Sequence, residues 1–270
     1  DLIAMADEAA QTLEYPNRLE AKSAEQEQTA RALREANDKL TALSIQKDAF
    51  LSQISHELRT PMTSIRSFSD ILRDGEIALP DQKRYSGIIH DEAIRLTGLL
   101  DDLLDLSVLE NGQVMLHMKT GNLAQLLERA IGAAGGFGDG IEIHCAPDME
   151  HVAVTTDLDR LVQVFINLIA NARKYCDAKN PQLKISVLNR GDRYFIDFVD
   201  NGSGIAPENQ ALIFEKFSRI TDGSTAGGAG LGLAICQEIM RRLGGDIVYL
   251  SGQYGTAFRV TLPKEKPVDC

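Results

Sequence analysis

The first 73 residues carry the feature that most limits how this chain can fold, a long seam of apolar side chains at helical spacing. Its members follow alternating steps of three and four residues, interrupted at Lys47: Leu33, Ala36, Leu40, Leu43, Phe50 and Ile54. This heptad pattern predicts nearly continuous helix from residue 17 to about 73, with Pro16 in its first turn. A single amphipathic helix lying on a globular core is the alternative. Because the region up to Leu40 offers no core, we favour a parallel dimeric coiled coil.

A second helix is expected after the loop at residues 74–80, which contains Gly75 and Pro80. It runs from about Asp81 to Glu110, ends at Asn111-Gly112, and presents one broad apolar face: Tyr85, Ile88, Ile89, Leu96, Leu99, Leu100, Leu103 and Leu106. That face is too wide for two helices alone, so two hairpins should pair into a dimeric four-helix bundle. Residues 111–120 are the expected hinge to the rest of the chain.

From Gly121 onward the pattern changes to a mixture of helices and strands. Helices are expected at residues 122–134, 157–175 and 231–243, and strands at 141–145, about 152–155, 183–188, 194–200, 247–250 and 257–262. The predicted fold class is an all-α dimeric hairpin with an N-terminal coiled coil, followed by an α+β sandwich. The expected domains are residues 1–45 (coiled-coil linker), 46–112 (hairpin), 118–264 (sandwich) and 265–270 (tail).

Composition and charge exclude several classes of function. With 28 Lys and Arg against 39 Asp and Glu, the net charge of −11 argues against non-specific nucleic-acid binding. No window approaches 18 uninterrupted apolar residues, so no membrane span is expected. The four cysteines lie too far apart for a zinc site or a disulfide framework, and we interpret them as thiols in a reducing compartment. Four of the five histidines have no suggestive neighbours: His90, His117, His144 and His151.

The fifth histidine lies in a polar cluster, SHELRTP, within the first helix. A neutral imidazole, here His56, can act as a nucleophile near neutral pH, and the adjacent Glu57 can accept its proton. Thr60 lies one helical turn beyond His56 and shares its face. Pro61 removes an N–H that would bond to the carbonyl of Glu57, which predicts a kink where a signal could bend the helix. We expect His56, Glu57 and Thr60 to face outward, while Phe50, Ile54 and Leu58 follow the seam.

Three further segments suit a nucleotide. In NLIANARKY, Asn167 and Asn171 project from one helix face, where neutral carboxamide oxygens could bind Mg²⁺. In DNGSG, Asp200 ends an apolar strand and could accept a hydrogen bond from an exocyclic amine. In GGAGLGLAI, glycines lead into a helix whose free N–H groups favour phosphate. Taken singly, the asparagines are better explained as a hydrogen-bonded surface pair and DNGSG as a β-turn, and the glycine motif is weak evidence. The last segment lacks the context of a Rossmann fingerprint and the Gly-Lys-Ser/Thr of a P-loop.

Taken in order, and with IFEKF before the glycine loop, these segments resemble the N, G1, F and G2 boxes of the GHKL ATPase superfamily. The resemblance implies a GHKL-type ATP-binding fold with ATP and Mg²⁺ as cofactors. It implies that Asn167 and Asn171 hold Mg²⁺, and that Phe214 and Phe217 anchor the base of a lid at residues 218–226. The remaining nucleotide contacts that it implies are Lys174 at a phosphate, Tyr175, Asp200, Gly202 and Gly204 at adenine, and Gly228, Gly230, Leu231 and Gly232 around the triphosphate.

SHELRTP resembles the H box of the sensor histidine kinases of two-component systems, which join a dimeric helical hairpin to a GHKL domain in this order. The resemblance implies a homodimeric autokinase that phosphorylates His56 and passes the phosphoryl group to an Asp of a separate response regulator. Its Glu-x-x-Thr arrangement, Glu57 and Thr60, also implies phosphatase activity toward that partner. The expected location is the cytoplasmic portion of a membrane-anchored sensor. Two alternatives are a nucleotide-binding scaffold without catalysis and a GHKL ATPase without phosphotransfer.

Overall fold

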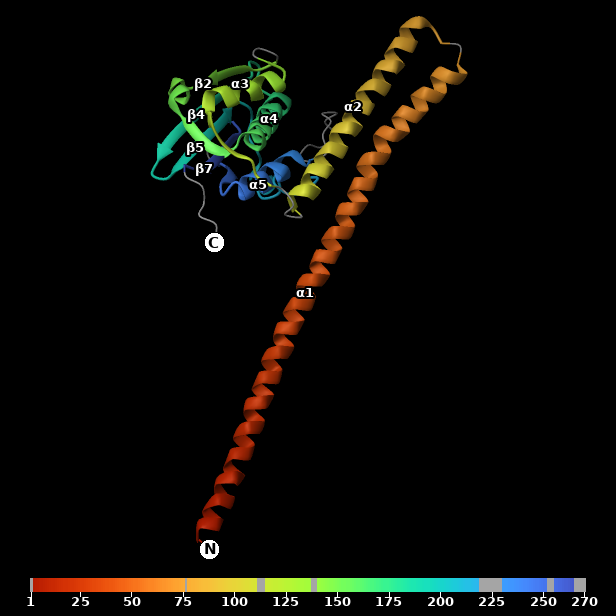
Figure 1. Ribbon diagram of the computed structural model, residues 1–270. Helices are drawn as coiled ribbons and strands as arrows, with labels where there is room; N and C mark the ends of the chain where they lie inside the picture. Colours follow the sequence, from red (N-terminus) through yellow and green to blue (C-terminus); the bar gives the residue numbers. More distant parts are fainter. Residues whose placement is uncertain are drawn as a thin grey trace. The chain divides into compact units, whose positions relative to one another are not determined.

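The computed structural model describes residues 2–75, 77–110, 115–136, 140–218, 230–251 and 255–264 (Figure 1). The chain forms two units, residues 1–56 and residues 57–270. No helix in the described ranges is both long enough and apolar enough to cross a membrane.

Helix α1 (Leu2–Asp74) begins well before the predicted start at residue 17. Pro16 therefore lies inside the helix, and its predicted place in the first turn was wrong. The residues before Pro16 are mostly Ala, Leu, Glu, Met and Gln, which have high helix propensity. The favourable free energy of the helical turns that they form is larger than the cost of the hydrogen bond that proline cannot donate. The helix also continues without a break through Pro61. Whether that turn bends in response to a signal stays a prediction.

The seam on the first unit is open in a single chain. The side chains of Leu33 and Leu40, both members of the seam, are 70% and 65% exposed. Apolar residues at heptad spacing lose contact with water when a second helix covers them. The open seam is therefore consistent with the predicted coiled coil, which stays a prediction for the single chain.

The second unit begins with a helical hairpin. The last part of α1 lies beside α2 (Leu79–Glu110), and the rings of Phe68 and Tyr85 stack with their centroids 5.2 Å apart. Pro80 was predicted in the loop but lies in the first turn of α2. Proline is tolerated there because N–H groups in the first turn have no acceptor within the helix. On the broad apolar face of α2, Leu100 is 45% exposed, and two apolar residues outside the predicted face, Ile94 and Leu104, are 59% and 64% exposed. The predicted four-helix bundle would cover such a face.

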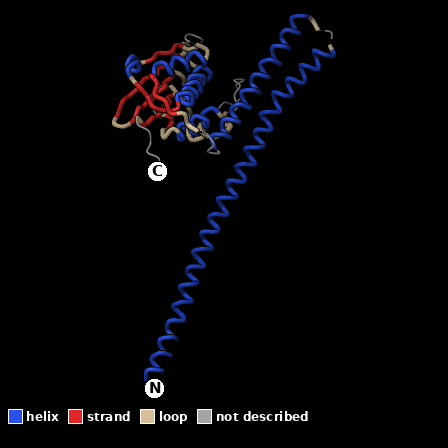
Figure 2. Tube along the Cα trace, viewed as in Figure 1, coloured by secondary structure: helices blue, strands red, loops and turns tan. Residues whose placement is uncertain are grey.

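The α+β part contains a two-stranded and a five-stranded sheet (Figure 2). Strand β1 (Met118–Asn122) pairs antiparallel with β3 (Ala153–Asp157). The larger sheet has the order β2-β4-β5-β7-β6, in which only the β2–β4 pair is parallel. Its strands are β2 (Glu142–Cys145), β4 (Gln182–Arg190), β5 (Arg193–Asp200), β6 (Asp246–Tyr249) and β7 (Ala257–Pro263). The described residues of the α+β part also form three helices and two short 3₁₀ segments: α3 (Leu123–Ala133), α4 (Leu158–Tyr175), α5 (Gly232–Arg242), η1 (Pro147–His151) and η2 (Pro207–Asn209).

The core lies between the helices and one face of the larger sheet. Along β5, Ile196 and Phe198 are buried, and the ring of Phe198 lies 5.4 Å from that of Phe165 on α4. The opposite face of the same strands carries the ion pair of Asp197 with Arg259, whose Nε lies 2.7 Å from the carboxylate. This alternation is typical of an antiparallel sheet covered on one side. The predicted helical hairpin followed by an α+β sandwich is confirmed, and its dimeric and coiled-coil parts stay predictions.

Local sequence signals correctly located two helix starts. Asn122 caps α3 by accepting a hydrogen bond from the N–H of Gln125 at 3.2 Å, and Asp157 caps α4 by accepting one from Arg160, also at 3.2 Å. The predicted hinge at residues 111–120 was too long, because β1 already begins at Met118. Its pairing with β3, a distant strand, holds this segment in the fold. Residues 111–114 and the predicted tail at 265–270 lie outside the described residues.

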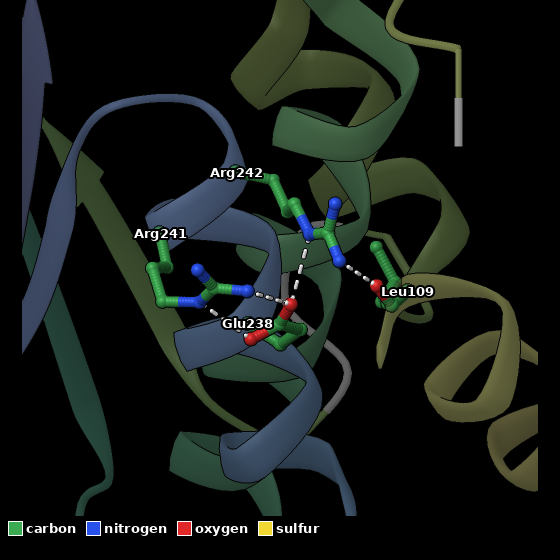
Figure 3. Close-up of polar contacts among 4 residues, drawn as sticks. All are labelled: Leu109, Glu238, Arg241 and Arg242. Atoms are coloured by element: carbon green, nitrogen blue, oxygen red, sulfur yellow. Dashed lines mark hydrogen bonds and ion pairs between the residues drawn. The ribbon is translucent and has the colours of Figure 1, made fainter. Parts of the chain in front are cut away.

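The end of the hairpin contacts the α+β part through arginine side chains. From α4, the Nη1 of Arg160 lies 3.1 Å from the Oδ1 of Asp105 on α2, and Gln163 donates to the same carboxylate at 2.6 Å. From α5, Arg242 donates a hydrogen bond to the backbone carbonyl of Leu109 near the end of α2, as Figure 3 shows. The Arg242 bond satisfies a carbonyl in the last turn of α2 that accepts no hydrogen bond inside its own helix.

Candidate functional site

The SHELRTP turn presents its residues on two faces. His56 is exposed, and so is Thr60, as predicted. Glu57, also predicted to face outward, is only 8% exposed and packs toward α2, where its carboxylate lies 3.8 Å from the Nη2 of Arg95. The prediction for Glu57 was wrong because each residue of a helix is rotated by about 100° from the one before. Pro61, one turn after Glu57, is buried on the same side.

The paired asparagines lie on α4 at the edge of its buried face. Asn167 and Asn171 are both half-buried, between core residues such as Leu168 and Ala172. A methyl group added to Gly232 would lie 3.4 Å from the Oδ1 of Asn167. The fold therefore brings the asparagine helix and the glycine-rich start of α5 together, although they are distant in sequence.

Two residues at the end of α4 combine a cation with an aromatic ring. The Nζ of Lys174 lies 4.7 Å from the ring centroid of its neighbour Tyr175. The Tyr175 side chain is about half exposed (49%). A flexible ammonium and an exposed ring at one helix end suit contacts to a phosphate and to a flat base.

Asp200 ends β5 as a buried carboxylate, 6% exposed. Its Oδ1 accepts hydrogen bonds from the N–H groups of Gly202 at 2.9 Å and Thr256 at 3.0 Å. Its Oδ2 has no hydrogen-bond partner among the described residues. One oxygen thus fixes the turn, and the second is available to accept a hydrogen bond from a ligand.

The glycines after Asp200 are required by close packing and by backbone conformation. A methyl group on Gly202 would lie 3.1 Å from carboxylate oxygens of both Asp177 and Asp200. Gly204 has a φ of +82°, in the left-handed region that side chains disfavour. A larger residue at Gly202 would have to displace these carboxylates, and one at Gly204 would strain the backbone.

Sequence reasoning missed two residues that hold this turn. The Oδ1 of Asp177 accepts a hydrogen bond from the N–H of Ser203 at 2.7 Å, and this bond together with the Ser203 hydroxyl keeps the pKa of Asp177 below its usual range. Asn201 accepts from the N–H of Gln182 at 2.8 Å and donates to the carbonyl of Asn180 at 2.9 Å. No local pattern marks either residue, because each acts across a loop.

The F and G2 segments meet through the backbone. The N–H of Phe217 donates to the carbonyl of Gly230 at 2.9 Å, and both residues adopt positive φ angles of 62° and 68°. A methyl group on Gly230 would come within 2.7 Å of the Ser218 carbonyl, so glycine is required there. The ring of Phe214 packs edge-on against Phe258 at 6.3 Å.

Parts of the predicted phosphate loop and lid cannot be placed. Gly228 and the lid from residue 219 to 226 lie outside the described residues. Leu231 is fully buried, so its backbone, and not its side chain, is what a nucleotide would contact. Gly232 begins α5, where Leu231 provides no side-chain cap, and the first N–H groups of the helix stay available to an anion.

These segments create one set of donors and acceptors around α4, the end of β5 and the start of α5. A buried carboxylate acceptor, two carboxamides, an ammonium and a helix N-terminus match the base, the cation and the phosphates of a nucleoside triphosphate.

Comparison with known families agrees with this assignment. Residues 156–266 match the histidine kinase-, DNA gyrase B-, and HSP90-like ATPase family, and residues 46–112 match the His Kinase A (phospho-acceptor) domain. The fold and the site thus define a GHKL ATPase domain joined to a phospho-acceptor hairpin. The chain is 28% identical over 241 residues to the sensor protein EvgS of Escherichia coli K12, covering 87% of this chain and 20% of EvgS. It is 31% identical over 233 residues to the aerobic respiration control sensor protein ArcB of the same strain, covering 83% of this chain and 30% of ArcB.

Solved structures give the same result. The Acinetobacter baumannii histidine kinase AdeS has a TM-score of 0.62 at 28% identity, with 78% of this chain and 98% of AdeS covered. The histidine kinase ThkA, solved in complex with the response regulator protein TrrA, has a TM-score of 0.63 at 25% identity, with 80% of this chain and 61% of ThkA covered. The chain belongs to the sensor histidine kinases of two-component systems. It spans about a fifth to a third of the length of EvgS and ArcB.

Proposed function

We propose that this chain is an ATP-dependent autokinase that phosphorylates His56 and passes the phosphoryl group to an Asp of a separate response regulator. The observation that carries the proposal is the joining of two parts in one chain. Asp200, the α4 asparagines and the start of α5 would form the nucleotide site, and an exposed histidine lies on the helix that precedes them. We propose domain bounds of 1–45 for the signalling helix, 46–112 for the acceptor hairpin and 118–264 for the ATP-binding domain, with a tail at 265–270.

The nucleotide would bind with its adenine at the Asp200 turn. The free Oδ2 of Asp200 would accept a hydrogen bond from the adenine amine, while Gly202 and Gly204 let the ring approach the backbone. Tyr175 would flank the base. The triphosphate would contact Lys174 and the glycine loop: Gly228, Gly230, the backbone of Leu231, and Gly232. Phe214 and Phe217 would anchor the base of the lid.

The donor set fits Mg²⁺ that arrives with the nucleotide. Asn167 and Asn171 offer neutral oxygens, and the described residues contain no cluster of three or more His, Cys, Asp or Glu side chains that could hold a metal ion. Mg²⁺ usually keeps several waters and substrate phosphates among its ligands, so two carboxamides are a suitable protein contribution. When bound, the ion supplies charge neutralisation for the phosphates.

The exposed imidazole of His56 is the group that reacts. A ring nitrogen forms a bond to the γ-phosphorus of ATP, the bond from that phosphorus to the bridging oxygen breaks, and ADP leaves. The proton on the other ring nitrogen passes to Glu57, which removes the positive charge that would otherwise develop on the ring. Phosphoryl transfer depends mainly on positioning and charge, so these few groups are sufficient.

The partners follow from the same chemistry. A phosphorylated imidazole is a reactive phosphoryl donor, and ThkA was solved with a response regulator. The exposed apolar face of α2 and the open seam of α1 support a homodimer. Thr60, exposed near the acceptor turn, would position water for dephosphorylation of the regulator. An anchor to the membrane would lie in a further part of the protein.

A labelling experiment with [γ-³²P]ATP tests the proposal. We expect label on the wild-type chain that is lost in acid and kept in base, no label on His56→Ala or Asn171→Ala, and normal label on His90→Ala, the matched control on α2. Label on His56→Ala would contradict the proposal. ATP hydrolysis without protein label would favour the ATPase alternative, and nucleotide binding without either reaction would favour the scaffold.

The phosphatase role has its own test. Thr60→Ala should keep autophosphorylation while losing dephosphorylation of a phosphorylated receiver domain. Thr63→Ala, an exposed threonine on the same helix, is the control. Equal dephosphorylation by both variants would exclude a role for the Thr60 hydroxyl.

A further inference from the structure

The acceptor turn contains an ion triad that spans the two helices of the hairpin. The Nη2 of Arg95 on α2 lies 3.8 Å from the Oε2 of Glu57, and its Nη1 lies 3.7 Å from the Oε2 of Glu92. Glu57 is buried, and Arg95 is about one third exposed. The Oε2 of Glu92 is also buried, and no described residue forms a hydrogen bond with it. One guanidinium thus serves two carboxylates through separate nitrogens.

The arrangement has a clear electrostatic consequence. A buried carboxylate keeps its charge only where a counter-charge or hydrogen bonds replace water. Arg95 supplies that counter-charge to both carboxylates, and its planar guanidinium limits the directions in which they can lie. Glu92 lies three residues before Arg95 on α2 and holds the guanidinium in place.

We propose that Arg95 is a positioning residue that holds the Glu57 carboxylate in its orientation beside His56, with Glu92 as its anchor. The proposal rests on the proposed function of His56 and Glu57. It gives α2, which carries no reacting group, a direct influence on the acceptor. A movement of α2 along α1 would change the Arg95–Glu57 distance and with it the readiness of His56 to react.

Replacing Arg95 tests this through the kinetic constants. Arg95→Gln should lower the rate of His56 phosphorylation at saturating Mg-ATP by about tenfold or more, a fraction of what general base catalysis supplies. The KM for ATP should stay within about twofold, because the nucleotide site is untouched. Arg95→Lys keeps the charge without the fork and should give an intermediate rate. Arg84→Gln, an exposed arginine on α2, is the matched control and should react like the wild type.

A double variant identifies the residue through which Arg95 acts. In a Glu57→Gln background, Arg95→Gln should cause no further loss, because the group that it positions is already gone. A full additional loss would overturn the proposal. A phosphorylation rate of Arg95→Gln equal to that of the wild type would also overturn it. So would a melting temperature of Arg95→Gln, measured by circular dichroism, so far below that of the wild type that partial unfolding explains the lower rate.

Phosphorylation of His56 by phosphoramidate separates this proposal from the proposed function. The reagent needs no ATP site: its P–N bond breaks, ammonia leaves, and the imidazole takes the phosphoryl group. Arg95→Gln should slow this reaction as well, while Arg84→Gln should not. If the wild type takes no label from ATP, the proposed function fails, but the phosphoramidate rates still decide the role of Arg95. Equal phosphoramidate rates for Arg95→Gln and the wild type would overturn it.

Discussion

Replacement of Asp200 by asparagine should weaken nucleotide binding without weakening the fold. The Oδ1 of Asp200 accepts two backbone hydrogen bonds, from Gly202 at 2.9 Å and Thr256 at 3.0 Å. An asparagine oxygen can accept both, and this fixes its amide so that the NH₂ group replaces Oδ2. The adenine amine would then meet a donor instead of an acceptor. A hydrogen bond to a charged group contributes about 1.5–3 kcal/mol, so the Kd for ATP should rise by about 10–150-fold.

Replacement of Asp200 by alanine should affect the fold as well. It leaves two N–H groups in a buried turn without an acceptor, at a cost of about 1–3 kcal/mol each. For a domain of this size, the melting temperature should fall by about 5–20 °C. The asparagine variant, which keeps the acceptor, should melt close to the wild type.

Titration calorimetry and thermal melting together check these expectations. Inosine triphosphate, which has a carbonyl in place of the amine, is the matched ligand, and Asp200→Asn should discriminate less than the wild type between it and ATP. Unchanged ATP affinity in Asp200→Asn would refute the role of Oδ2. An alanine variant as stable as the asparagine variant would refute the role of Oδ1.

Two further predictions concern the C-terminal half of α2 and its contacts with α5. Burial, reinforced by Asp105 and Asp101, raises the pKa of Asp102 to about 6. The folded chain therefore binds this proton more tightly than the unfolded chain, and its contribution to stability is lost as the pH rises from 3.8 to about 6. Asp102→Asn should flatten that slope in urea unfolding and be the more stable form at neutral pH; an unchanged slope would contradict this. Arg242→Ala removes the hydrogen bond to Leu109 shown in Figure 3 and should cost about 1–3 kcal/mol in urea unfolding, while Arg241→Ala, an exposed partner of Glu238, should cost about 0.5 kcal/mol or less. Equal costs would contradict a structural role for the Leu109 contact.

The sequence by itself determined the elements of this protein and the chemistry of its segments. Helical periodicity located the hairpin, and short-range capping signals located the starts of α3 and α4 at Asn122 and Asp157. Asp200 and the glycines after it were identifiable because a carboxylate at the end of an apolar strand and residues without side chains carry their properties in any fold. These features depend on neighbours within a few residues, so the linear sequence contains them.

Only the tertiary structure decided what each face meets. Glu57 is buried because α2 lies against its side of α1, and Arg95 and Glu92 take part only because α2 brings them to that turn. In the same way, Asp177 supports the Asp200 turn across a loop. Contacts between elements distant in sequence depend on how the chain packs. Local periodicity shows which face of a helix or strand is apolar, but it does not show which other element packs against that face. The residues that contact Glu57 and the Asp200 turn from other elements are therefore the ones that the sequence did not reveal.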